Sequence, residues 1–371
     1  MLVMSNAAVA QIREIRTTGE YRMGDNDTRA DAKRLALLDA KRAAIEQAGT
    51  FLASSTQVQN FKLTKDQIEA YAAGITQVIE QGTRATMDGD TMVIRVDALV
   101  RINVEDMVRR IDDLRKNSAT SDQVLEMQKQ MKALEEQVQS QTKQIATLTS
   151  KADVDRATAE RQQALAKVDS RQLLAQAWVA LVGSLDSSFI VGSTSIDGRV
   201  QAKRLAEQAL QADPNLADAH YMLSRVLGED KRYQEAEREA RLGLRQNPTA
   251  AGHNELAIVL QNEGRIDEAI AEYRLSLQMN PNSQISHYNL AVALEDQGRP
   301  VEAAMEYRES LRINPGFAGA HYAYGDCLRK LGNRAGAMYE LREYLRLAGD
   351  NPALKDKVDR ARAMLTELSR P

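Results

Sequence analysis

The chain has 371 residues, of which 43% are hydrophobic, and its 49 basic and 52 acidic side chains give a net charge of −3. This composition excludes a disordered chain, and the lack of a basic stripe in the sequence argues against nucleic acid as a partner. The single cysteine, Cys327, excludes an internal disulfide and a four-cysteine metal site. No apolar run approaches the roughly 20 residues that span a bilayer, so we expect no transmembrane segment.

The first ten residues, MLVMSNAAVA, end in Ala8-Val9-Ala10, a small-x-small pattern that signal peptidase accepts. We therefore expect residues 1–10 to be the remnant of an export signal, and the protein to be periplasmic or otherwise exported. The apolar run is short, and no basic residue precedes it. The alternative is the N-terminal tail of a cytoplasmic protein.

Residues 11–116 are expected to form a small α+β domain. The stretch QIREIRTTGEYRMG predicts a strand that leads into a turn. Asp27 or Thr28 then caps a helix that runs through Gln47 and is closed by Gly49. The following stretch, STQVQNFKL, predicts extended chain.

The second half of this domain carries a short helix and a hairpin. Thr64 and Gln67 form a capping box for a helix that stops at Gly74. The alternating segment TMVIRVDALVRIN predicts a strand that pairs with ITQVIEQGTRAT across a turn at residues 88–90. One face of the alternating strand carries apolar residues, namely Ile94, Val96, Ala98, Val100 and Ile102.

The pattern GEYRMGDNDTRADAKRLALLDAKRAAIEQAG, followed by these elements, resembles a bacterial envelope domain. That domain occurs in small surface lipoproteins and at the N-terminus of flagellar assembly protein T, and the likeness covers roughly residues 16–104. It implies an exported domain with a structural role. The heptads and repeats that follow are not part of that family's pattern.

From residue 121 to 155 apolar residues recur with a heptad period. The a positions hold Val124, Met131, Val138, Ile145 and Ala152, and the d positions hold Met127, Leu134, Gln141 and Leu148. This pattern predicts a coiled coil which, with a connecting helix, covers residues 121–168 and joins chains into a dimer or trimer through 121–155. The alternative is one long helix that lies on another domain.

The C-terminal part repeats with a period of about 34 residues. Prolines recur at 214, 248, 281 and 315, alanines at 202, 236, 269, 303 and 337, and glycines at 264, 298 and 332. This pattern resembles the tetratricopeptide repeat (TPR), a pair of helices joined by a tight turn. We expect four such repeats in residues 215–352, an irregular one with a long loop in 170–214, and a capping helix in 353–371. The loop, residues 187–198, is expected either to dock on a partner or to be a flexible insertion. The fold class is thus mainly α, with an α+β N-terminal domain, a coiled-coil stalk and a C-terminal TPR α-solenoid.

All four histidines occupy one repeat position, at 220, 253, 287 and 321. Metal ligands converge within about 2.1 Å of one ion, whereas neighbouring packed helices lie about 8 to 10 Å apart, so equivalent residues cannot share a metal. We therefore predict packing histidines, no metal and no cofactor. Without a reactive serine or cysteine beside a histidine, the sequence also predicts no enzyme.

The TPR resemblance implies that the first helix of each repeat lines a groove that binds protein or peptide. The groove positions here hold Tyr221, Arg225, Asn254, Ile258, Gln261, Asn262, Tyr288, Val292, Tyr322, Asp326, Arg329 and Lys330. Tyrosines 221, 288 and 322 share one position and are predicted either to contact a peptide or to pack within the solenoid. The Lys and Asn clamp with which chaperone-binding TPRs hold a C-terminal carboxylate is absent from the sequence.

These patterns predict an oligomeric, non-catalytic scaffold of the bacterial cell envelope that captures a protein partner. The order of coiled coil and then TPR also resembles the periplasmic TPR coordinator of the Tol machinery. The alternative is a cytoplasmic TPR adaptor or co-chaperone.

Overall fold

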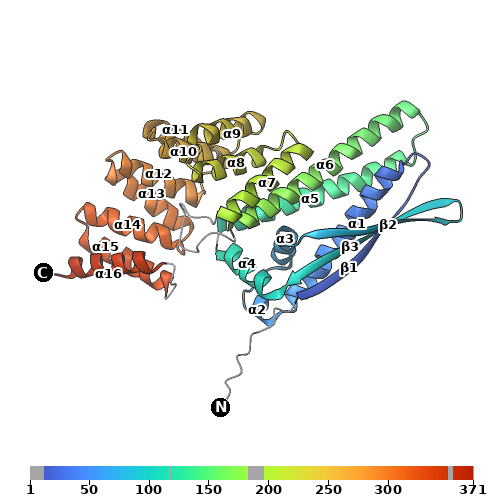
Figure 1. Cartoon of the computed structure of the whole chain (residues 1–371). Helices are drawn as coiled ribbons and strands as arrows, with labels where there is room; N and C mark the ends of the chain where they lie inside the picture. The colour runs from blue at the N-terminus through green and yellow to red at the C-terminus, as the bar shows by residue number, and fades with distance from the viewer. Residues whose placement is uncertain (1–11, 117, 183–195, 350–353, 371) are drawn as a thin grey trace, which may run out of the picture. The chain divides into compact units, whose positions relative to one another are not determined.

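The computed structural model describes residues 12–116, 118–182, 196–349 and 354–370, which fall into two compact units (Figure 1). The first unit contains residues up to 183 and the short stretch 211–214, and the second contains the remainder. The predicted export remnant at 1–10 and residues 187–195 of the predicted loop lie outside the described residues. Within those residues, no helix is both long and apolar enough to cross a membrane.

The first unit is built on a three-stranded antiparallel sheet of order β1-β3-β2, with β1 at Ile12–Arg22, β2 at Val78–Asp88 and β3 at Thr91–Asn103. The hairpin turn between β2 and β3 places Gly89 at φ 61°, a left-handed conformation that glycine adopts without strain. The predicted inward face of β3 is confirmed, because its five apolar residues are at most 3% exposed. This face of the sheet forms one side of the hydrophobic core of the first unit.

Helix α1 (Arg29–Ala53) packs on that sheet through a row of buried alanines. The backbones of α1 and β1 lie close together at Gly19, where an added Cβ would lie 2.0 Å from the carbonyl oxygen of Ala36. The Thr28 side chain caps the helix by accepting a hydrogen bond from the backbone N–H of Asp31, as predicted. The predicted end at Gly49 is wrong: the helix continues to Ala53, because Gly49 is buried against α3 and has helical neighbours on both sides.

Three short helices complete the part of this unit that precedes residue 117. Helix α2 (Thr56–Gln59) forms where extended chain was predicted. Helix α3 (Lys65–Ile75) has the predicted capping box of Thr64 and Gln67 and runs one residue past Gly74. Helix α4 (Val104–Lys116) follows β3 directly.

The predicted stalk is a helical hairpin that belongs to the first unit. Helix α5 (Ser118–Ile145) ends in a turn at residues 146–150, and α6 (Lys151–Val182) returns along it (Figure 1). One continuous helix over 121–155 is therefore a wrong prediction. The heptad residue Val138 is buried with Leu35 of α1 and with Ala164 and Leu165 of α6, so the heptad face is covered within one chain.

A buried ionic cluster fastens α6 to the turn before α1. The fully buried Arg161 donates from Nη1 to Oδ1 of Asp27 at 3.0 Å, and its Nη2 lies 3.7 Å from Oδ2 of Asp31. Tyr21 of β1 donates to the other oxygen of Asp27 at 2.8 Å, and Gln162 donates to Asp31 at 2.9 Å. A buried charge is costly without a partner of opposite charge, so these contacts join α6 to β1 and to the residues at the start of α1.

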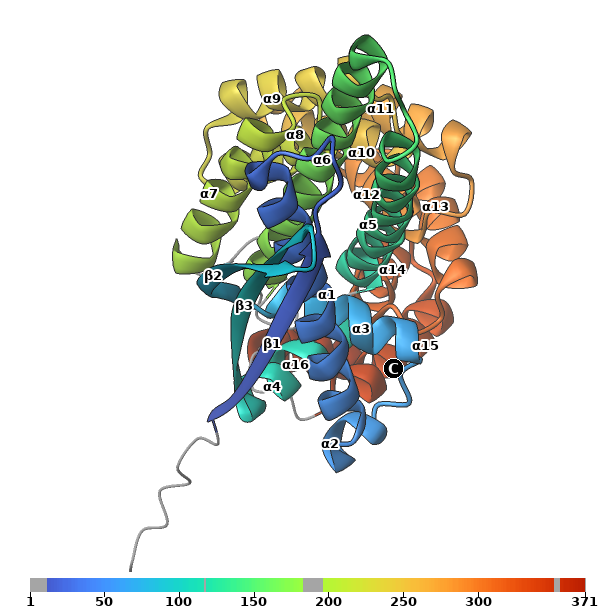
Figure 2. The ribbon, with the colours of Figure 1, turned by 90° about the vertical axis from the view of Figure 1, so that its right-hand side faces the viewer.

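The second unit is a stack of helix pairs, the TPR architecture that the repeats predict (Figure 2). Most of α7 (Ile196–Ala212) belongs to it. The four pairs, each with helix A then helix B, are α8 (Ala217–Glu229) with α9 (Tyr233–Gln246), α10 (Ala250–Asn262) with α11 (Ile266–Met279), α12 (Gln284–Asp296) with α13 (Pro300–Ile313), and α14 (Ala318–Lys330) with α15 (Arg334–Ala348). The predicted capping helix is α16 (Lys355–Ser369).

The repeat marks have the roles that their chemistry predicts. Gly264, Gly298 and Gly332 have φ between 76° and 81° in the turn between helices A and B, and Lys231 takes the same left-handed turn in the first pair. The repeat alanines are all fully buried, both Ala202 on α7 and the four on the B helices, namely Ala236, Ala269, Ala303 and Ala337. A larger side chain there would push the helices apart, which costs about 1 to 3 kcal/mol.

Candidate protein-binding surface

Successive A helices contact one another, and polar side chains join each to the next. Four contacts form what we call the inner ladder. They are Arg225 Nε to Glu255 Oε2 at 3.3 Å, Asn289 Nδ2 to Asn254 Oδ1 at 3.1 Å, Gln261 Nε2 to Asp296 Oδ2 at 2.7 Å, and Lys330 Nζ to Glu295 Oε1 at 3.1 Å. Each contact crosses from one repeat to the following one, so the ladder runs the length of the four pairs.

The inner ladder includes four predicted groove residues: Arg225, Asn254, Gln261 and Lys330. The sequence did not reveal their partners, which sit one repeat away at separations of 30 or 35 residues. Asp326 and Arg329 also lie at this surface, where Asp326 pairs with Arg329 at 2.7 Å and with Lys330 at 2.9 Å. Burial alone would lower the pKa of Lys330, but hydrogen bonds to Asp326 and Glu295 outweigh it and hold that pKa above its ordinary value.

In the first helix pair, the predicted groove residue Tyr221 packs in the core. Tyr221 is 3% exposed and donates to the backbone oxygen of Asn247 at 2.7 Å. Its ring fills the space beside two glycines, since an added Cβ would lie 2.5 Å from the ring at Gly243 and 2.3 Å from the hydroxyl oxygen at Gly252. Of the two roles predicted for Tyr221, the structure shows packing within the solenoid.

The other two tyrosines are half-buried and pack against aromatic neighbours. Tyr288 lies 5.8 Å from Tyr307 and 5.1 Å from Phe317, and Tyr322 meets Tyr344 edge-on at 5.1 Å between ring centroids. Ile258 and Val292 are partly buried in the core of the repeats, whereas Asn262 is exposed. Polar groups thus make up most of the accessible part of the predicted groove.

The four histidines share a feature that their repeat position did not predict. In every pair, Nδ1 of the helix A histidine lies 2.6 to 2.7 Å from a glutamate oxygen on helix B, nineteen residues later. The pairs are His220 with Glu239, His253 with Glu272, His287 with Glu306 and His321 with Glu340. The sequence contains a glutamate nineteen residues after each histidine, and this constant spacing could have predicted the pairs.

These pairs fasten helix A to helix B within a repeat, and two of them are tied further. The Nε2 atoms of His287 and His321 lie 3.1 and 3.0 Å from the backbone oxygens of Pro281 and Pro315. Burial favours the neutral rings, but the hydrogen bonds to glutamate and to the proline carbonyls prevail and raise the pKa of both histidines above 6.5. Within the described residues, no group of three or more potential ligands is arranged to hold a metal.

The one cysteine is an inert core residue. Cys327 is fully buried in helix A of the last pair, and its Sγ donates to the backbone oxygen of Pro300 at 3.3 Å. Burial raises the pKa of its thiol to about 11, so the reactive thiolate is scarce at neutral pH.

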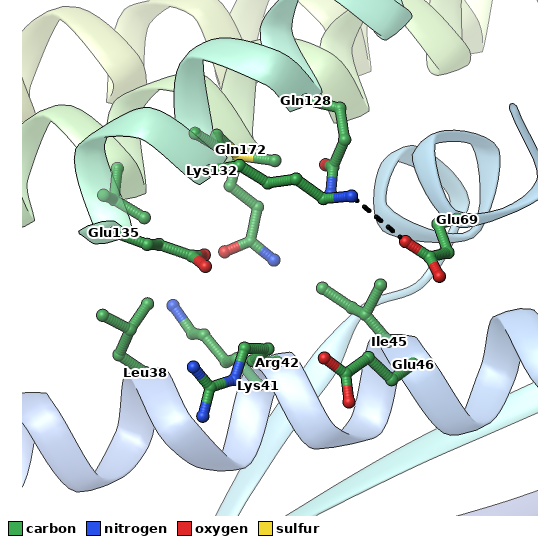
Figure 3. Close-up of a pocket in the computed structure, with 12 residues that line it drawn as sticks. Leu38, Lys41, Arg42, Ile45, Glu46, Glu69, Gln128, Lys132, Glu135 and Gln172 are labelled. Atoms are coloured by element: carbon green, nitrogen blue, oxygen red, sulfur yellow. Dashed lines mark hydrogen bonds and ion pairs between the residues drawn. The ribbon is translucent and has the colours of Figure 1, made fainter. Parts of the chain in front are cut away.

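The first unit contains a small cavity of about 130 Å³ between α1, α3, α5 and α6 (Figure 3). Ion pairs border it: Lys132 contacts Glu69 at 3.2 Å, and Lys41 contacts Asp169 at 3.1 Å. Figure 3 shows the Glu135 carboxylate directed into this space, and burial raises the pKa of that carboxyl. The cavity places a poorly solvated acid inside the unit.

Two family models described as tetratricopeptide repeat match residues 254–318 and 294–361. No protein with a curated description matches the chain. Among solved structures, a TPR protein titled YrrB, "with an unusual peptide-binding site", is 20% identical, with 55% of this chain and 96% of that chain covered and a TM-score of 0.36. Pseudomonas aeruginosa pilF is 24% identical, with coverage of 46% and 81% and a TM-score of 0.39.

A third solved structure is the type III secretion chaperone SycD of Yersinia enterocolitica, in complex with a peptide of the translocator YopD. It is 17% identical, with coverage of 31% of this chain and 88% of that chain and a TM-score of 0.30. At TM-scores this low, these likenesses carry no information about what the present chain binds. The matches to the family models and the four stacked helix pairs identify residues 217–348 as TPR repeats.

Proposed function

We propose that this tetratricopeptide-repeat protein is a non-catalytic interaction scaffold that binds a partner polypeptide along its inner ladder. The observation that carries the proposal is the line of polar contacts that crosses every junction between successive A helices. Asn254 and Asn289 are buried, so they join the repeats and do not meet a ligand. The accessible members of the line, Gln261, Asp296 and Lys330, present hydrogen-bond donors and acceptors on successive A helices, which suits an extended or helical polypeptide.

The ladder favours a ligand with mixed charge. Gln261, Asp296 and Lys330 keep part of their surface accessible while Gln261 bonds to Asp296 and Lys330 bonds to Glu295, so a ligand group competes with a neighbouring side chain. Exchange of one hydrogen bond for another gives little net free energy, roughly 0.5 to 1.5 kcal/mol per bond. Affinity therefore comes from several contacts along the ladder, and a single truncation is expected to have a modest effect.

The test is a comparison of captured proteins. A variant with Gln261→Ala, Asp296→Ala and Lys330→Ala is immobilised beside the wild type and beside a control with Arg204→Ala and Arg360→Ala, two exposed sites away from the ladder. Quantitative mass spectrometry of envelope extract should show a partner lost from the ladder variant and retained by the control. If both variants retain the same proteins, the inner ladder is not the binding site. Circular dichroism checks that each variant is folded.

The proposed location is the cell envelope, with the cytoplasm as the alternative. The Ala8-Val9-Ala10 pattern and the resemblance of residues 16–104 to an envelope domain support it. A fusion of the natural gene to alkaline phosphatase, which is active only outside the cytoplasm, provides the test. An inactive but expressed fusion would leave the cytoplasmic adaptor as the better proposal.

The proposed dimer or trimer through residues 121–155 depends on the heptad pattern alone. The burial of Val124, Met131, Val138 and Ile145 within one chain leaves these residues unexposed, so oligomers through this face require the hairpin to open. Light scattering of the whole chain tests it directly: a mass of one chain contradicts the oligomer, and a mass of two or three supports it.

A further inference from the structure

The B helices present an outer face that the inner ladder does not use. In α13 the buried residues are Ala303, Tyr307 and Ser310. At 3.6 residues per turn, Val301, Met305 and Arg308 lie on the opposite side of that helix, and each is exposed. Because each repeat packs on the next in the same orientation, equivalent residues of successive B helices form rows along this outer face.

One of these rows consists only of arginines. Arg241, Arg274, Arg308 and Arg342 occupy the same repeat position in all four pairs, and all are exposed. Arg241 pairs with Glu237 at 2.7 Å. In the ranges that the structure describes, none of the other three forms an ion pair within the chain. The net charge of the chain does not reveal this row, because acidic residues elsewhere on the same helices balance the arginines.

An apolar patch borders the arginine row in the last two pairs. Val301, Met305 and Tyr339 are 65%, 55% and 61% exposed. Met305 and Tyr339 are equivalent residues, each three positions before an arginine of the row, and Val301 lies one turn before Met305. In the first two pairs the position of Met305 holds Arg238 and Ala271, and the exposed large apolar residues of α11 are Leu275 and Met279. Clustered large apolar side chains on a surface indicate an interaction site.

We propose that the outer face of α13 and α15 is a second binding surface, and that its partner is an acidic amphipathic helix of another protein. The helix would place aliphatic or aromatic side chains on Val301, Met305 and Tyr339, and carboxylates against Arg308 and Arg342. Arginine suits this role because its guanidinium binds a carboxylate through two parallel hydrogen bonds. Arginine and tyrosine are also enriched where interfaces concentrate binding free energy.

The charges around the patch favour discrete carboxylates over a continuous polyanion. Glu302, Glu309 and Glu343 lie on the same two helices and pair with Arg299, Arg312 and Arg346. A nucleic acid or an anionic membrane would bring phosphates against these glutamates, and the repulsion would offset the attraction of the row. A helix can place its carboxylates at the arginines alone. Because this face is separate from the inner ladder, one chain could hold two partners at once.

The test uses a defined probe and the whole chain. The probe is a fluorescein-labelled helical peptide of about 18 residues with Leu and Phe on one face and Glu on its flanks. Its counterpart has every Glu replaced by Lys. Fluorescence anisotropy should show that the wild type binds the acidic probe, that binding weakens between about 0.05 M and 0.3 M salt, and that the lysine counterpart does not bind.

Variants then locate the site. Arg308→Glu with Arg342→Glu should weaken binding at least about tenfold, and Met305→Ser with Tyr339→Ser should do the same without changing the salt dependence. The control is Arg204→Glu with Arg360→Glu, which reverses two exposed arginines on α7 and α16, outside the four helix pairs, and should retain wild-type affinity. The inner-ladder variant should also retain it, so failure of this surface and failure of the inner ladder are distinguishable.

Three results would overturn the proposal. The first is no binding of the acidic probe by the wild type at about 100 μM, which corresponds to less than roughly 5.5 kcal/mol of binding free energy. The second is equal weakening in the control. The third is binding of anionic lipid vesicles or duplex DNA in place of the peptide, lost in the same arginine variant, which would assign the surface to a polyanion. Circular dichroism checks that each variant keeps the helix content of the wild type.

Discussion

Nδ1 of His321 on α14 lies 2.6 Å from Oε2 of Glu340 on α15, and every regular repeat has the same pair nineteen residues apart. The pair joins helix A to helix B within a repeat. In the last two repeats the contact also raises the pKa of the imidazole, so the stability of those two helix pairs depends on protonation of His287 and His321.

The stabilisation that His287 and His321 give to the repeats should fall as the pH rises above 6.5. The pKa values of His287 and His321 are raised above 6.5 on folding, so each proton is held more tightly by the folded chain. The contribution of the two histidines to the free energy of unfolding is fully present below pH 6.5. It is lost as the pH rises through their higher pKa values in the folded chain. Replacing both histidines with Gln should cost about 1 to 2 kcal/mol near pH 6 and less near pH 9.

Thermal unfolding of the wild type and of this double variant at several pH values provides the measurement. The difference between the two curves isolates the histidines from the other groups that titrate over the same range. A constant difference from about pH 6 to pH 9 would show that the pairs are not protonated in the folded chain.

Replacing Arg161 with Ala should destabilise the first unit by about 3 to 5 kcal/mol, because Asp27 and Asp31 would be left buried without a cation. The matched control is Arg156→Ala on the same helix, where an exposed arginine pairs with Asp153 and the expected loss is below about 1 kcal/mol. Urea denaturation followed by circular dichroism measures both. Equal losses would contradict the role assigned to the buried cluster.

Replacing Glu135 with Gln should stabilise the first unit at neutral pH. Burial raises the pKa of this carboxyl, so its ionised form is less stable in the folded chain than in the unfolded chain. The loss of stability caused by the ionised carboxylate grows as the pH rises from 4.5 through the raised pKa of Glu135. Near pH 4 the carboxyl is protonated in both states, so the variant and the wild type should be equally stable. Glu136→Gln, an exposed neighbour on α5, is the control and should leave the unfolding midpoint unchanged.

Replacing Gly252 with Ala should cost about 1 to 3 kcal/mol, because the new Cβ would lie 2.3 Å from the Tyr221 hydroxyl oxygen. Removing the ring as well, with Tyr221→Ala, should make the two losses less than additive. Gly228→Ala is the control, since its Cβ would meet only a methyl group of Val259 at 3.9 Å. Additive losses in the double variant would mean that the ring and the glycine do not share this space.

Local chemistry made part of the fold predictable. The capping box at Thr64, the hairpin turn at Gly89 and the repeat glycines each depend on residues within a few positions of one another. The end of α1 was mistaken because a glycine that usually closes a helix is here packed against Glu69 of α3, a contact that no local pattern reveals. The heptad face was correctly identified as buried, but its partners come from the same chain.

The candidate surface was predictable only in part for a related reason. Repeat position correctly places Arg225, Asn254, Gln261 and Lys330 on helix A, but their partners are set by how one repeat stacks on the next. Tyr221 packs in the core because Gly243 and Gly252 leave space for its ring, and the spacing of the repeats alone does not distinguish this packing role from a contact role. A tyrosine at the same position without those glycines, such as Tyr288, is only half-buried.

The helical hairpin α5–α6 also bears on how the chain acquires its structure during synthesis. Leu35 of α1 is covered by Ala164 and Leu165, and Gly74 of α3 faces Val179, so the first unit cannot complete its core until residues near 180 have left the ribosome. Each TPR pair, by contrast, joins helices separated by a few residues and can form soon after it emerges. Helix α1 is therefore synthesised well before its contacts on α6 can form, and the side chains that α6 covers stay exposed during that interval.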